Sequence, residues 1–319
     1  MAKPLLFITG FLGAGKTTLL RALLDELSKV GRTADVILND FENAEIDAST
    51  LHERAASIYP IAASCACCDS LDDLVKLCLA TQNSKGDVLL IELNGTADPL
   101  PLLETFTLVE EKLPFLPRWQ VGVVDARHWG QRDEFAPLEQ RQVETASHWM
   151  TAHTEELAEA EIDRVSQSVS KVNPFGRKVD AMQLAADLAS EGKALPNGPE
   201  NATVHRLARG TSRTGHSLAH RLTGYQIPLP GRYRRNQVID LLEALPDEVV
   251  RAKAMVEIEE SPDVRWLFQR TGRDPVDKPV EVANLSRTPA SLVCVGPCLA
   301  PESLRALVRS HLDERHVCL

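Results

Sequence analysis

A phosphate-binding loop set between a strand and a helix constrains this chain more than any other feature. Residues 10–17 read Gly-Phe-Leu-Gly-Ala-Gly-Lys-Thr and fit the pattern G-x-x-x-x-G-K-[ST]. Before them, residues 4–9 form a short apolar run typical of a buried parallel strand, and residues 18–30 have the pattern of a helix. A glycine-rich turn that matched the pattern by chance would not need a strand before it and a helix after it. We therefore predict an α/β fold with a nucleoside triphosphate site.

The loop supplies groups that suit phosphates and a divalent cation. Its small residues let backbone N–H groups turn inward, and the helix N-terminus adds partial positive charge. The Lys16 ammonium reaches the terminal phosphates, which makes it a catalytic candidate, and the Thr17 hydroxyl is a ligand for Mg²⁺. The predicted nucleotide-binding residues in this segment are Gly13, Ala14, Gly15, Lys16, Thr17 and Thr18.

The rest of the first half predicts a P-loop NTPase parallel sheet with helices on both faces. The helix after the loop carries its leucines on one stripe, as expected for packing against a sheet. Apolar runs at residues 35–38, 88–91 and 121–124 are short and separated by helical or loop segments, as in a doubly wound sheet. Residues 139–170 carry many charges and are predicted as one or two helices.

The pattern changes near residue 210, after a cluster of glycine, proline and asparagine at residues 192–201. Beyond it, short strand-like and helical segments alternate, which predicts a smaller α+β domain. The expected strands are residues 217–227, 254–258 and 291–295, and the expected helices are residues 236–244 and 302–312. We therefore predict a P-loop nucleotide-binding domain over residues 1–210 and a small α+β C-terminal domain over residues 211–319.

Charge and hydropathy argue against several classes of partner. Acidic residues outnumber basic ones by 45 to 35, for a formal net charge of −10, which argues against a nucleic-acid surface. No apolar stretch approaches the roughly 20 residues of a membrane span, and the N-terminus lacks the features of a signal peptide. We expect a cytoplasmic protein with no nucleic-acid or membrane partner, whose ligands are small molecules, metals or other proteins.

A strand-terminal acid and a glycine supply two further parts that a triphosphatase needs. Glu92 ends the apolar run at residues 88–91 and is a candidate to hold Mg²⁺. Gly95 follows three positions later and can bring its amide to the γ-phosphate without a side chain in the way. On its own this would be an ordinary strand end followed by a turn, but the phosphate loop favours the functional interpretation.

A second acidic segment follows the run at residues 35–38 and contains Asp40 and Glu45. It has the position of a switch that closes over the nucleotide, and Asp40 is the candidate for the catalytic base. The spacing fits an ordinary solvated loop equally well, so both interpretations stay open.

Three closely spaced thiols form the most unusual stretch of the chain. Cys65, Cys67 and Cys68 are dense enough to bind Zn²⁺ or another thiophilic ion. In an extended segment Cys65 and Cys67 point the same way and Cys68 the opposite way, so three thiolates converge only if the backbone turns after Cys67. At most three local ligands leave a position open, which favours a metal in transit over a structural metal. The alternative is a group of small buried cysteines.

Two other pairs have metal-ligand residue types without a convincing site. His216 and His220 are four residues apart, but satisfied or exposed histidine is the default in a chain with nine histidines. Cys294 and Cys298 are weaker candidates still.

The order of these segments resembles the CobW-like family of P-loop GTPases of the metallochaperone type. Residues 10–20 are similar to its phosphate loop, residues 39–41 to its Asn-Glu-Phe switch, residues 65–68 to its Cys-x-Cys-Cys motif, and residues 92–99 to its Glu-x-x-Gly-x-Ala-Asp-Pro stretch. Further similar positions are residues 124–126, 142–144, 173–174 and 246–255. The resemblance implies GTP hydrolysis coupled to delivery of Zn²⁺, Co²⁺ or a similar ion to a client metalloprotein.

One segment departs from that resemblance. Where the family carries Asn-Lys-x-Asp, this chain reads Ala-His-Thr-Glu at residues 152–155. Ala152 cannot replace the asparagine that helps orient guanine, whereas Glu155 keeps a carboxylate and His153 can stack on a base. We therefore include His153 and Glu155 among the predicted nucleotide-binding residues and expect a weakened preference for guanine.

The leading hypothesis is a metal-handling GTPase in which loss of the γ-phosphate opens the thiolate site. Lys16, Thr17 and Glu92 would hold the phosphates and Mg²⁺, and the three cysteines would hold the cargo ion. The alternatives are a nucleotide- and metal-binding regulatory module without efficient turnover, a relative that uses ATP, and a P-loop kinase for a small metabolite.

Overall fold

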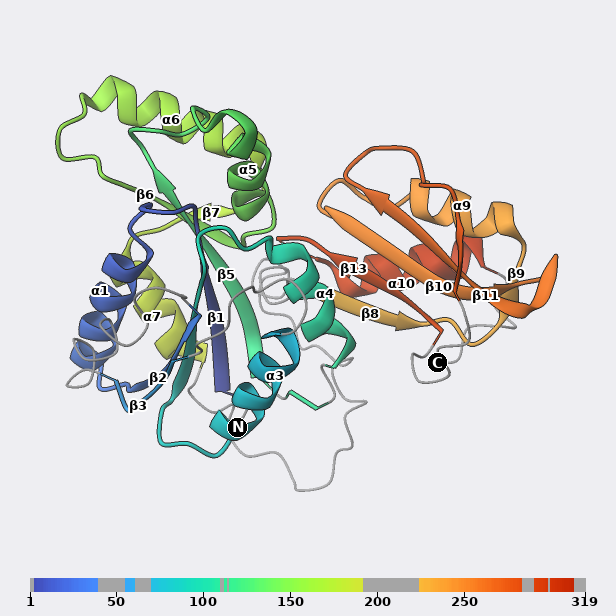
Figure 1. The fold of residues 1–319 in the computed structure, drawn as a ribbon, viewed down its shortest axis with the longest axis horizontal. Coiled ribbons are helices and arrows are strands. Elements are labelled where there is room, and N and C mark those ends of the chain that lie inside the picture. The colour runs from blue at the N-terminus through green and yellow to red at the C-terminus, as the bar shows by residue number, and fades with distance from the viewer. Residues whose placement is uncertain are drawn as a thin grey trace.

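The computed structural model describes residues 3–39, 55–60, 70–109, 112–113, 115–191, 224–282, 290–297 and 299–312. Within these ranges the chain forms two β-sheets, one from the N-terminal part and one from the C-terminal part (Figure 1). The domain boundary near residue 210 lies outside the described residues and stays a prediction.

The first sheet has seven strands in the order β3-β2-β4-β1-β5-β6-β7, and every neighbouring pair is parallel. The strands are β1 (Lys3–Thr9), β2 (Ala34–Asn39), β3 (Ser57–Pro60), β4 (Val88–Leu93), β5 (Phe115–Asp125), β6 (His148–Ala152) and β7 (Arg177–Lys178). β1 lies in the centre, between β4 and β5. The loops that follow these three strands therefore meet at one edge of the sheet, where α/β proteins bind ligands.

Helices cover both faces of this sheet, which confirms the predicted fold class (Figure 1). α1 (Lys16–Lys29) and α7 (Ala181–Glu191) share a core with one face, whereas α3 (Ser70–Thr81) and α4 (Pro99–Leu108) share a core with the other. A short 3-10 turn, η1 (Asp133–Phe135), leads into α5 (Ala136–Glu144), and α6 (Glu159–Val172) follows β6. α5 and α6 contribute Val143 and Val169 to a small core beside β5 and β6.

Residues 139–170 contain two helices, which is one of the two predicted alternatives, and also a strand between them that was not predicted. α5 ends at Glu144, the strand β6 occupies His148–Ala152, and α6 begins at Glu159. β6 pairs in parallel with β5, with Val121 opposite His148 and Asp125 opposite Ala152. The strand forms because it can pair with the edge of β5. This contact is between residues distant in the chain, so the charged local sequence does not predict it.

The second sheet has six strands, in the order β12-β11-β10-β13-β8 with β9 beside β10. The strands are β8 (Gly224–Pro228), β9 (Arg232–Tyr233), β10 (Arg251–Ile258), β11 (Ser261–Thr271), β12 (Val280–Val282) and β13 (Ser291–Val295). α9 (Arg235–Glu243) and α10 (Pro301–His311) share one core with this sheet. Both helices overlap predicted helical segments, and β8, β10 and β13 overlap predicted strands, whereas β9, β11 and β12 were not anticipated.

α4 packs between the two sheets (Figure 1). On the first sheet, the rings of Phe106 and Phe7 meet edge to face with centroids 5.0 Å apart. On the other side, Glu104 pairs with Arg251 and Lys253 of β10, at 2.9 and 2.5 Å. α4 is apolar around most of its circumference because it is buried on two sides.

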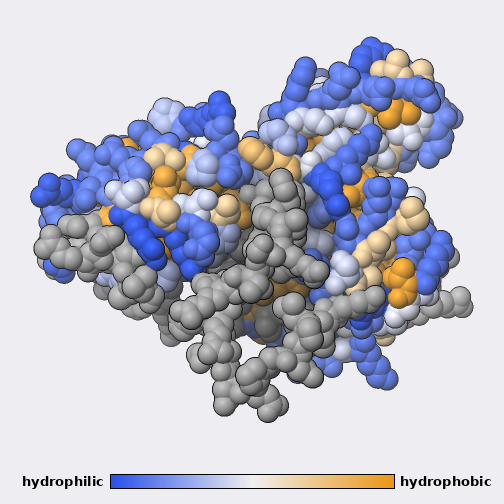
Figure 2. Space-filling view, turned by 180° about the vertical axis from the view of Figure 1, so that it is seen from behind, coloured by the Kyte–Doolittle hydropathy of each residue, from blue (hydrophilic) through white to orange (hydrophobic). Residues whose placement is uncertain are grey.

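The face shown in Figure 2 is largely hydrophilic, with hydrophobic side chains in small separate groups. Among the exposed large hydrophobic residues are Leu12 and Phe135. In the ranges that the structure describes, no helix has the length and apolar character needed to cross a membrane.

Candidate nucleotide-binding site

The phosphate loop, residues 10–17, joins β1 to α1 as predicted. Gly10 has φ +143°, and a Cβ at this position would lie 2.5 Å from the carbonyl oxygen of Val123 in β5. Only glycine fits there, because any side chain would collide with the backbone of the neighbouring strand. The backbone at the start of the loop therefore lies in close contact with β5, and the loop leads into α1 at Lys16.

Lys16 folds back over the loop that carries it. Its side chain is buried, and Nζ donates to the carbonyl oxygens of Gly10 at 3.1 Å and Phe11 at 3.2 Å. These two carbonyls hold the ammonium inside the loop, where a bound phosphate would lie. An anion in the loop would compete for the same donor hydrogens, since a charge-assisted bond to phosphate is stronger than a bond to a neutral carbonyl.

Thr17 and Glu92 meet although they are 75 residues apart in the chain. The Thr17 hydroxyl donates to Glu92 Oε1 at 2.8 Å, and Glu92 is 3% exposed at the end of β4. Mg²⁺ prefers hard oxygen ligands in a compact arrangement. A hydroxyl oxygen next to a buried carboxylate fits that donor set, so these two predicted Mg²⁺ residues form a suitable pair.

Gly95 lies against the phosphate loop. A Cβ at Gly95 would lie 2.6 Å from the backbone nitrogen of Leu12 and 2.8 Å from its Cα. The close approach requires glycine, and it brings the turn after β4 into contact with the loop after β1. The sequence-predicted neighbour of the γ-phosphate is therefore placed beside the residues predicted to bind the phosphates.

The segment at residues 150–155 forms the wall of a pocket next to the start of α1. The pocket has a volume of about 210 Å³. It is lined by Gly15, Thr18, Leu19, Ala22, Met150, Thr151, Ala152, His153, Thr154, Glu155 and Ala181. Loop residues and the two predicted base-binding residues thus line one cavity. Glu155 is exposed at this pocket and offers a carboxylate that only accepts hydrogen bonds.

The His153 imidazole has a partner that the sequence did not predict. Nε2 lies 2.9 Å from the carbonyl oxygen of Gly13. A carbonyl can only accept, so Nε2 carries the hydrogen in this contact. His153 and Ala152 both lie close to Gly15, where a Cβ would meet them at 3.7 and 3.3 Å. The end of β6 is therefore fixed directly to the phosphate loop, and stacking of His153 on a base stays a prediction.

A charged cluster beside the phosphate loop was also missed. Asp125 ends β5 and is 2% exposed, and it accepts hydrogen bonds from Arg127, His128 and Arg132. Burial alone would raise its pKa, but the hydrogen bonds from Arg127 and His128 and the charge of Arg127 hold the pKa of Asp125 well below its usual range. The only sequence signal for this residue was its place in the resemblance at residues 124–126.

The same cluster contacts the phosphate loop through aromatic rings. The Arg132 guanidinium lies 4.9 Å from the centre of the Phe11 ring, and the Phe11 and Phe135 rings are 5.6 Å apart. A guanidinium over an aromatic face is a favourable contact. Residues 125–135 therefore support the outer side of the loop without supplying a predicted phosphate ligand.

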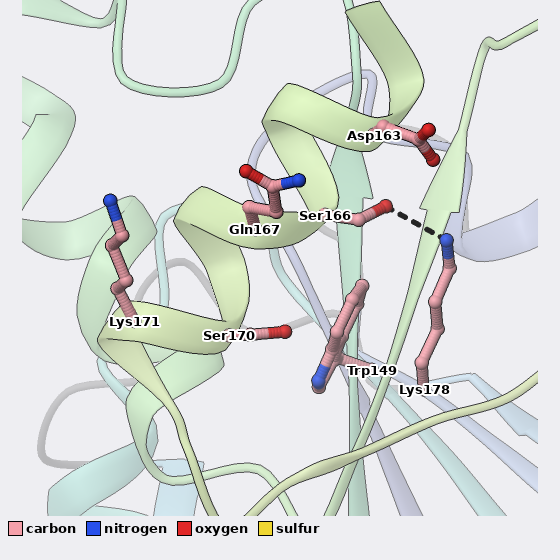
Figure 3. A pocket seen from close by; sticks show the side chains of 7 residues that line it. All are labelled: Trp149, Asp163, Ser166, Gln167, Ser170, Lys171 and Lys178. Atoms are coloured by element: carbon pink, nitrogen blue, oxygen red, sulfur yellow. Dashed lines mark hydrogen bonds between the residues drawn. The ribbon is translucent and has the colours of Figure 1, made fainter. Parts of the chain in front are cut away.

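A larger hollow, of about 440 Å³, lies elsewhere, beneath α6 at the edge strand β7 (Figure 3). Lys178 crosses it, with Nζ 2.8 Å from Ser166 Oγ and 5.6 Å from the centre of the Trp149 ring. Its lining residues are Trp149, Asp163, Ser166, Gln167, Ser170, Lys171 and Lys178. None of them belongs to the phosphate loop. Although this hollow is larger than the pocket at residues 150–155, it is therefore not the candidate nucleotide site.

Several predicted ligands fall outside the described residues. These are Asp40, Glu45, Cys65, Cys67, Cys68, His216, His220 and Cys298. Cys294 is described and buried in the core of the second sheet, and burial raises the pKa of its thiol to about 12. Among the residues with described positions, no group of three or more histidine, cysteine, aspartate or glutamate side chains is placed to hold a metal ion.

The sequence is similar to a known protein family and to several characterised proteins. The family model for the CobW/HypB/UreG nucleotide-binding domain matches residues 4–179. The zinc chaperone YjiA of Escherichia coli is 33% identical over 173 residues, which is 52% of this chain and 53% of that protein. The zinc chaperone CobW of Pseudomonas aeruginosa is 36% identical over 114 residues, 32% of this chain and 30% of that protein. The chain thus spans about half or less of the length of these relatives.

Two solved structures also align with the chain, at low sequence identity. The alignment with the crystal structure of Zn(II)-bound YjiA GTPase from E. coli covers 97% of this chain and 99% of the YjiA chain, at 23% sequence identity and a TM-score of 0.45. A hydrogenase maturation factor HypB from Archaeoglobus fulgidus covers 60% of this chain and 91% of its own, at 17% identity and a TM-score of 0.43.

Proposed function

Because the chain belongs to the CobW/HypB/UreG family, we propose that it is a metal-binding nucleoside triphosphatase that uses GTP and delivers a Zn²⁺- or Co²⁺-type ion to a client metalloprotein. The observation that carries this proposal is the meeting of Lys16, Thr17, Glu92 and Gly95 at one edge of the sheet, next to the pocket lined by residues 150–155. Family membership supports the nucleotide, and the names of the relatives support the metal.

In this proposal the phosphate half of the site works by positioning and by charge. Lys16 leaves the carbonyls of Gly10 and Phe11 and binds the terminal phosphates. Thr17 and Glu92 hold Mg²⁺, which would neutralise charge on the phosphate oxygens. The loop amides of Gly13 and Gly15 add further donors, since the N-terminus of α1 starts at this point. The Ala14 amide would join them by leaving the carbonyl oxygen of Phe11, to which it donates at 3.1 Å.

The base half of the site favours guanine through Glu155. Its carboxylate can accept hydrogen bonds from the two N–H groups on the guanine edge, which adenine cannot provide in the same pattern. Ala152 offers no amide to assist, so we propose a modest preference for GTP over ATP. Use of ATP is the alternative, and the apolar Ala152 side chain at the pocket is the observation that favours it.

For the cargo we propose Cys65, Cys67 and Cys68 as the ligands. Thiolates suit Zn²⁺ and Co²⁺, and three of them leave a coordination position for exchange with the client. The cysteines lie in sequence between β3 and α3, and thus between the proposed switch at Asp40 and the Glu92 strand. A change at the γ-phosphate would reach the metal through these neighbours, so hydrolysis would gate release.

Calorimetric titration with GTP and with ATP, both with Mg²⁺, tests the nucleotide proposal directly. We expect binding of both, with GTP several-fold tighter. Equal affinities would remove the assignment to GTP, and absence of binding would remove the proposal.

A turnover assay distinguishes the enzyme from a regulatory module that only binds. Lys16→Ala should abolish multiple turnover, whereas Lys29→Ala, an exposed lysine on the same helix, should not. If the parent chain is as slow as Lys16→Ala, the regulatory alternative is correct.

Competition for Zn²⁺ or Co²⁺ against a chromogenic chelator tests the coupling. We expect tighter metal binding with a non-hydrolysable triphosphate than with diphosphate. Equal metal affinity in the two nucleotide states would exclude gating by hydrolysis, because coupling is a difference in free energy between states.

A further inference from the structure

Residues 94–97, called here the Gly95 turn, form hydrogen bonds with one another. The carbonyl oxygen of Asn94 accepts from the amide of Ala97 at 3.0 Å. The Asn94 side-chain oxygen accepts from the amide of Thr96 at 3.0 Å and from its hydroxyl at 3.1 Å. Among the residues that the structure describes, the Gly95 amide has no acceptor. The Gly95 amide is therefore available as a donor, beside the phosphate loop at Leu12.

A buried amide on α5 holds this turn from the opposite side. Gln142 is 1% exposed, and its Nε2 donates to the carbonyl oxygens of Gly95 and Ala97, both at 3.0 Å. Both partners can only accept, so the NH₂ group of Gln142 must face the turn. The two bonds hold the carbonyls of Gly95 and Ala97 in place from outside the turn.

Gln142 is itself held against the central strands. A Cβ at Gly122 of β5 would lie 3.2 Å from the carbonyl oxygen of Gln142, so the absence of a side chain there lets α5 approach closely. That carbonyl accepts from the Thr9 hydroxyl at 3.1 Å and from Gln120 Nε2 at 2.9 Å. Thr9 directly precedes the phosphate loop. One glutamine thus connects the strand that enters the loop to the turn that faces it.

Stability alone is a poor explanation for a glutamine here. Gln142 Oε1 is buried and has no hydrogen-bond donor among the described residues, and the same is true of Gln120 Oε1. A buried amide oxygen without a donor destabilises a fold relative to an apolar side chain of similar shape. The part of Gln142 that is satisfied is the part that contacts the Gly95 turn.

We propose that Gln142 is a positioning residue that sets the Gly95 amide for the terminal phosphate and so makes the site distinguish triphosphate from diphosphate. This inference rests on the proposed nucleotide function and adds how the site senses the γ-phosphate. The Gly95 amide would contact only the phosphate that hydrolysis removes, whereas the phosphate loop contacts the phosphates common to both nucleotides. Loss of Gln142 should therefore weaken one ligand and spare the other.

The test measures dissociation constants for GDP and for a non-hydrolysable GTP analogue, with Mg²⁺, in the parent chain and in Gln142→Met. Methionine keeps the volume of the side chain and removes the donor. We expect roughly a tenfold loss of affinity for the analogue, the size of one hydrogen bond to a charged group, and less than about a twofold change for GDP.

Asn173→Leu is the matched control. The Asn173 amide also donates to two backbone carbonyls, both at 2.7 Å, but these belong to Val143 and Ala146, at the end of α5 and just after it, and not to the Gly95 turn. This variant should lower the melting temperature and leave the ratio of the two dissociation constants unchanged. If Gln142→Met does not fold, Gln142→Asn retains the amide on a stem too short to reach both carbonyls and should show the same selective loss.

The outcomes separate this inference from the proposed function. Equal weakening of both ligands in the Gln142 variants, or an unchanged ratio, would overturn the positioning role while the parent chain still binds nucleotide. A parent chain that binds neither ligand would overturn the proposed function, and the inference with it.

Discussion

His153 Nε2 donates to the carbonyl oxygen of Gly13 at 2.9 Å, and this contact ties the end of β6 to the phosphate loop. His153 also has φ +56°, in the left-handed region that few non-glycine residues occupy. A backbone strained at this position persists only where neighbouring contacts hold it. The imidazole contact is one of them, and it joins the base half of the site to the phosphate half.

Removal of the imidazole should weaken nucleotide binding. His153→Ala loses the bond to Gly13, and a neutral hydrogen bond contributes about 0.5–1.5 kcal/mol, which corresponds to roughly 2- to 12-fold in affinity. Titration with a fluorescent GDP analogue measures the change. His153→Ala with parental affinity would show that the contact is incidental.

His153→Gly is the control for backbone strain. Glycine also lacks the imidazole but adopts positive φ without cost, so it should bind GDP as weakly as His153→Ala and unfold at a higher temperature. Equal stability of the two variants would argue that the strain at His153 is small.

Thr17→Val should raise the Mg²⁺ concentration that GTP hydrolysis requires. Valine has nearly the shape of threonine but cannot contribute an oxygen or donate to Glu92 Oε1. We expect the Mg²⁺ concentration for half-maximal GTP hydrolysis to rise by about tenfold, the effect of roughly 1.4 kcal/mol. Thr17→Ser keeps the hydroxyl and should stay close to the parent. The same Mg²⁺ dependence in Thr17→Val and the parent would exclude Thr17 as a ligand.

The parts of the site that were predictable share a local cause. The phosphate loop follows from glycine spacing between an apolar run and an amphipathic helix, all within residues 4–30. Glu92 and Gly95 were identifiable because a polar residue at the end of a buried strand stands out against its neighbours. Parallel pairing of β1 with β4 then brings Glu92 level with Ile8, as the predicted sheet requires.

The parts that were missed depend on contacts between distant residues. β6 has the sequence His-Trp-Met-Thr-Ala, with no apolar run or clean alternation, and becomes a strand by pairing with β5. Gln142 and Gly95 are 47 residues apart, and no pattern in either segment indicates that they meet. The roles of Asp125 and of the Gly13 carbonyl likewise become visible only when the strands are placed side by side.

Glu104→Gln should destabilise the contact of α4 with the second sheet. Glu104 is largely buried and faces both Arg251 and Lys253, so the neutral variant leaves two positive charges at the interface with weaker partners. Since both cations are partly exposed, we expect a loss of about 1–2 kcal/mol in unfolding free energy, less than for a fully buried pair. Urea denaturation measures it.

Glu26→Gln provides the comparison for that change. Glu26 pairs with Lys29 on the exposed side of α1, and such solvent-screened pairs change the free energy of unfolding very little. A Glu104→Gln effect no larger than this would mean that the charges at α4 contribute nothing beyond an ordinary surface pair.

Asp125→Asn should make the fold less stable at neutral pH and change how stability depends on acid. The pKa of Asp125 is lower in the folded chain than in the unfolded chain, so its carboxylate stabilises the fold above the unfolded value of about 4, and this contribution is lost as the pH falls toward the folded value. The gap in unfolding free energy between the parent and Asp125→Asn should therefore be constant from about pH 8 to 5 and narrow below about pH 4. Urea denaturation of both chains across this range measures the gap. A gap that stays constant down to about pH 3, or is absent at pH 7, would show that Arg127, His128 and Arg132 do not stabilise the ionised form.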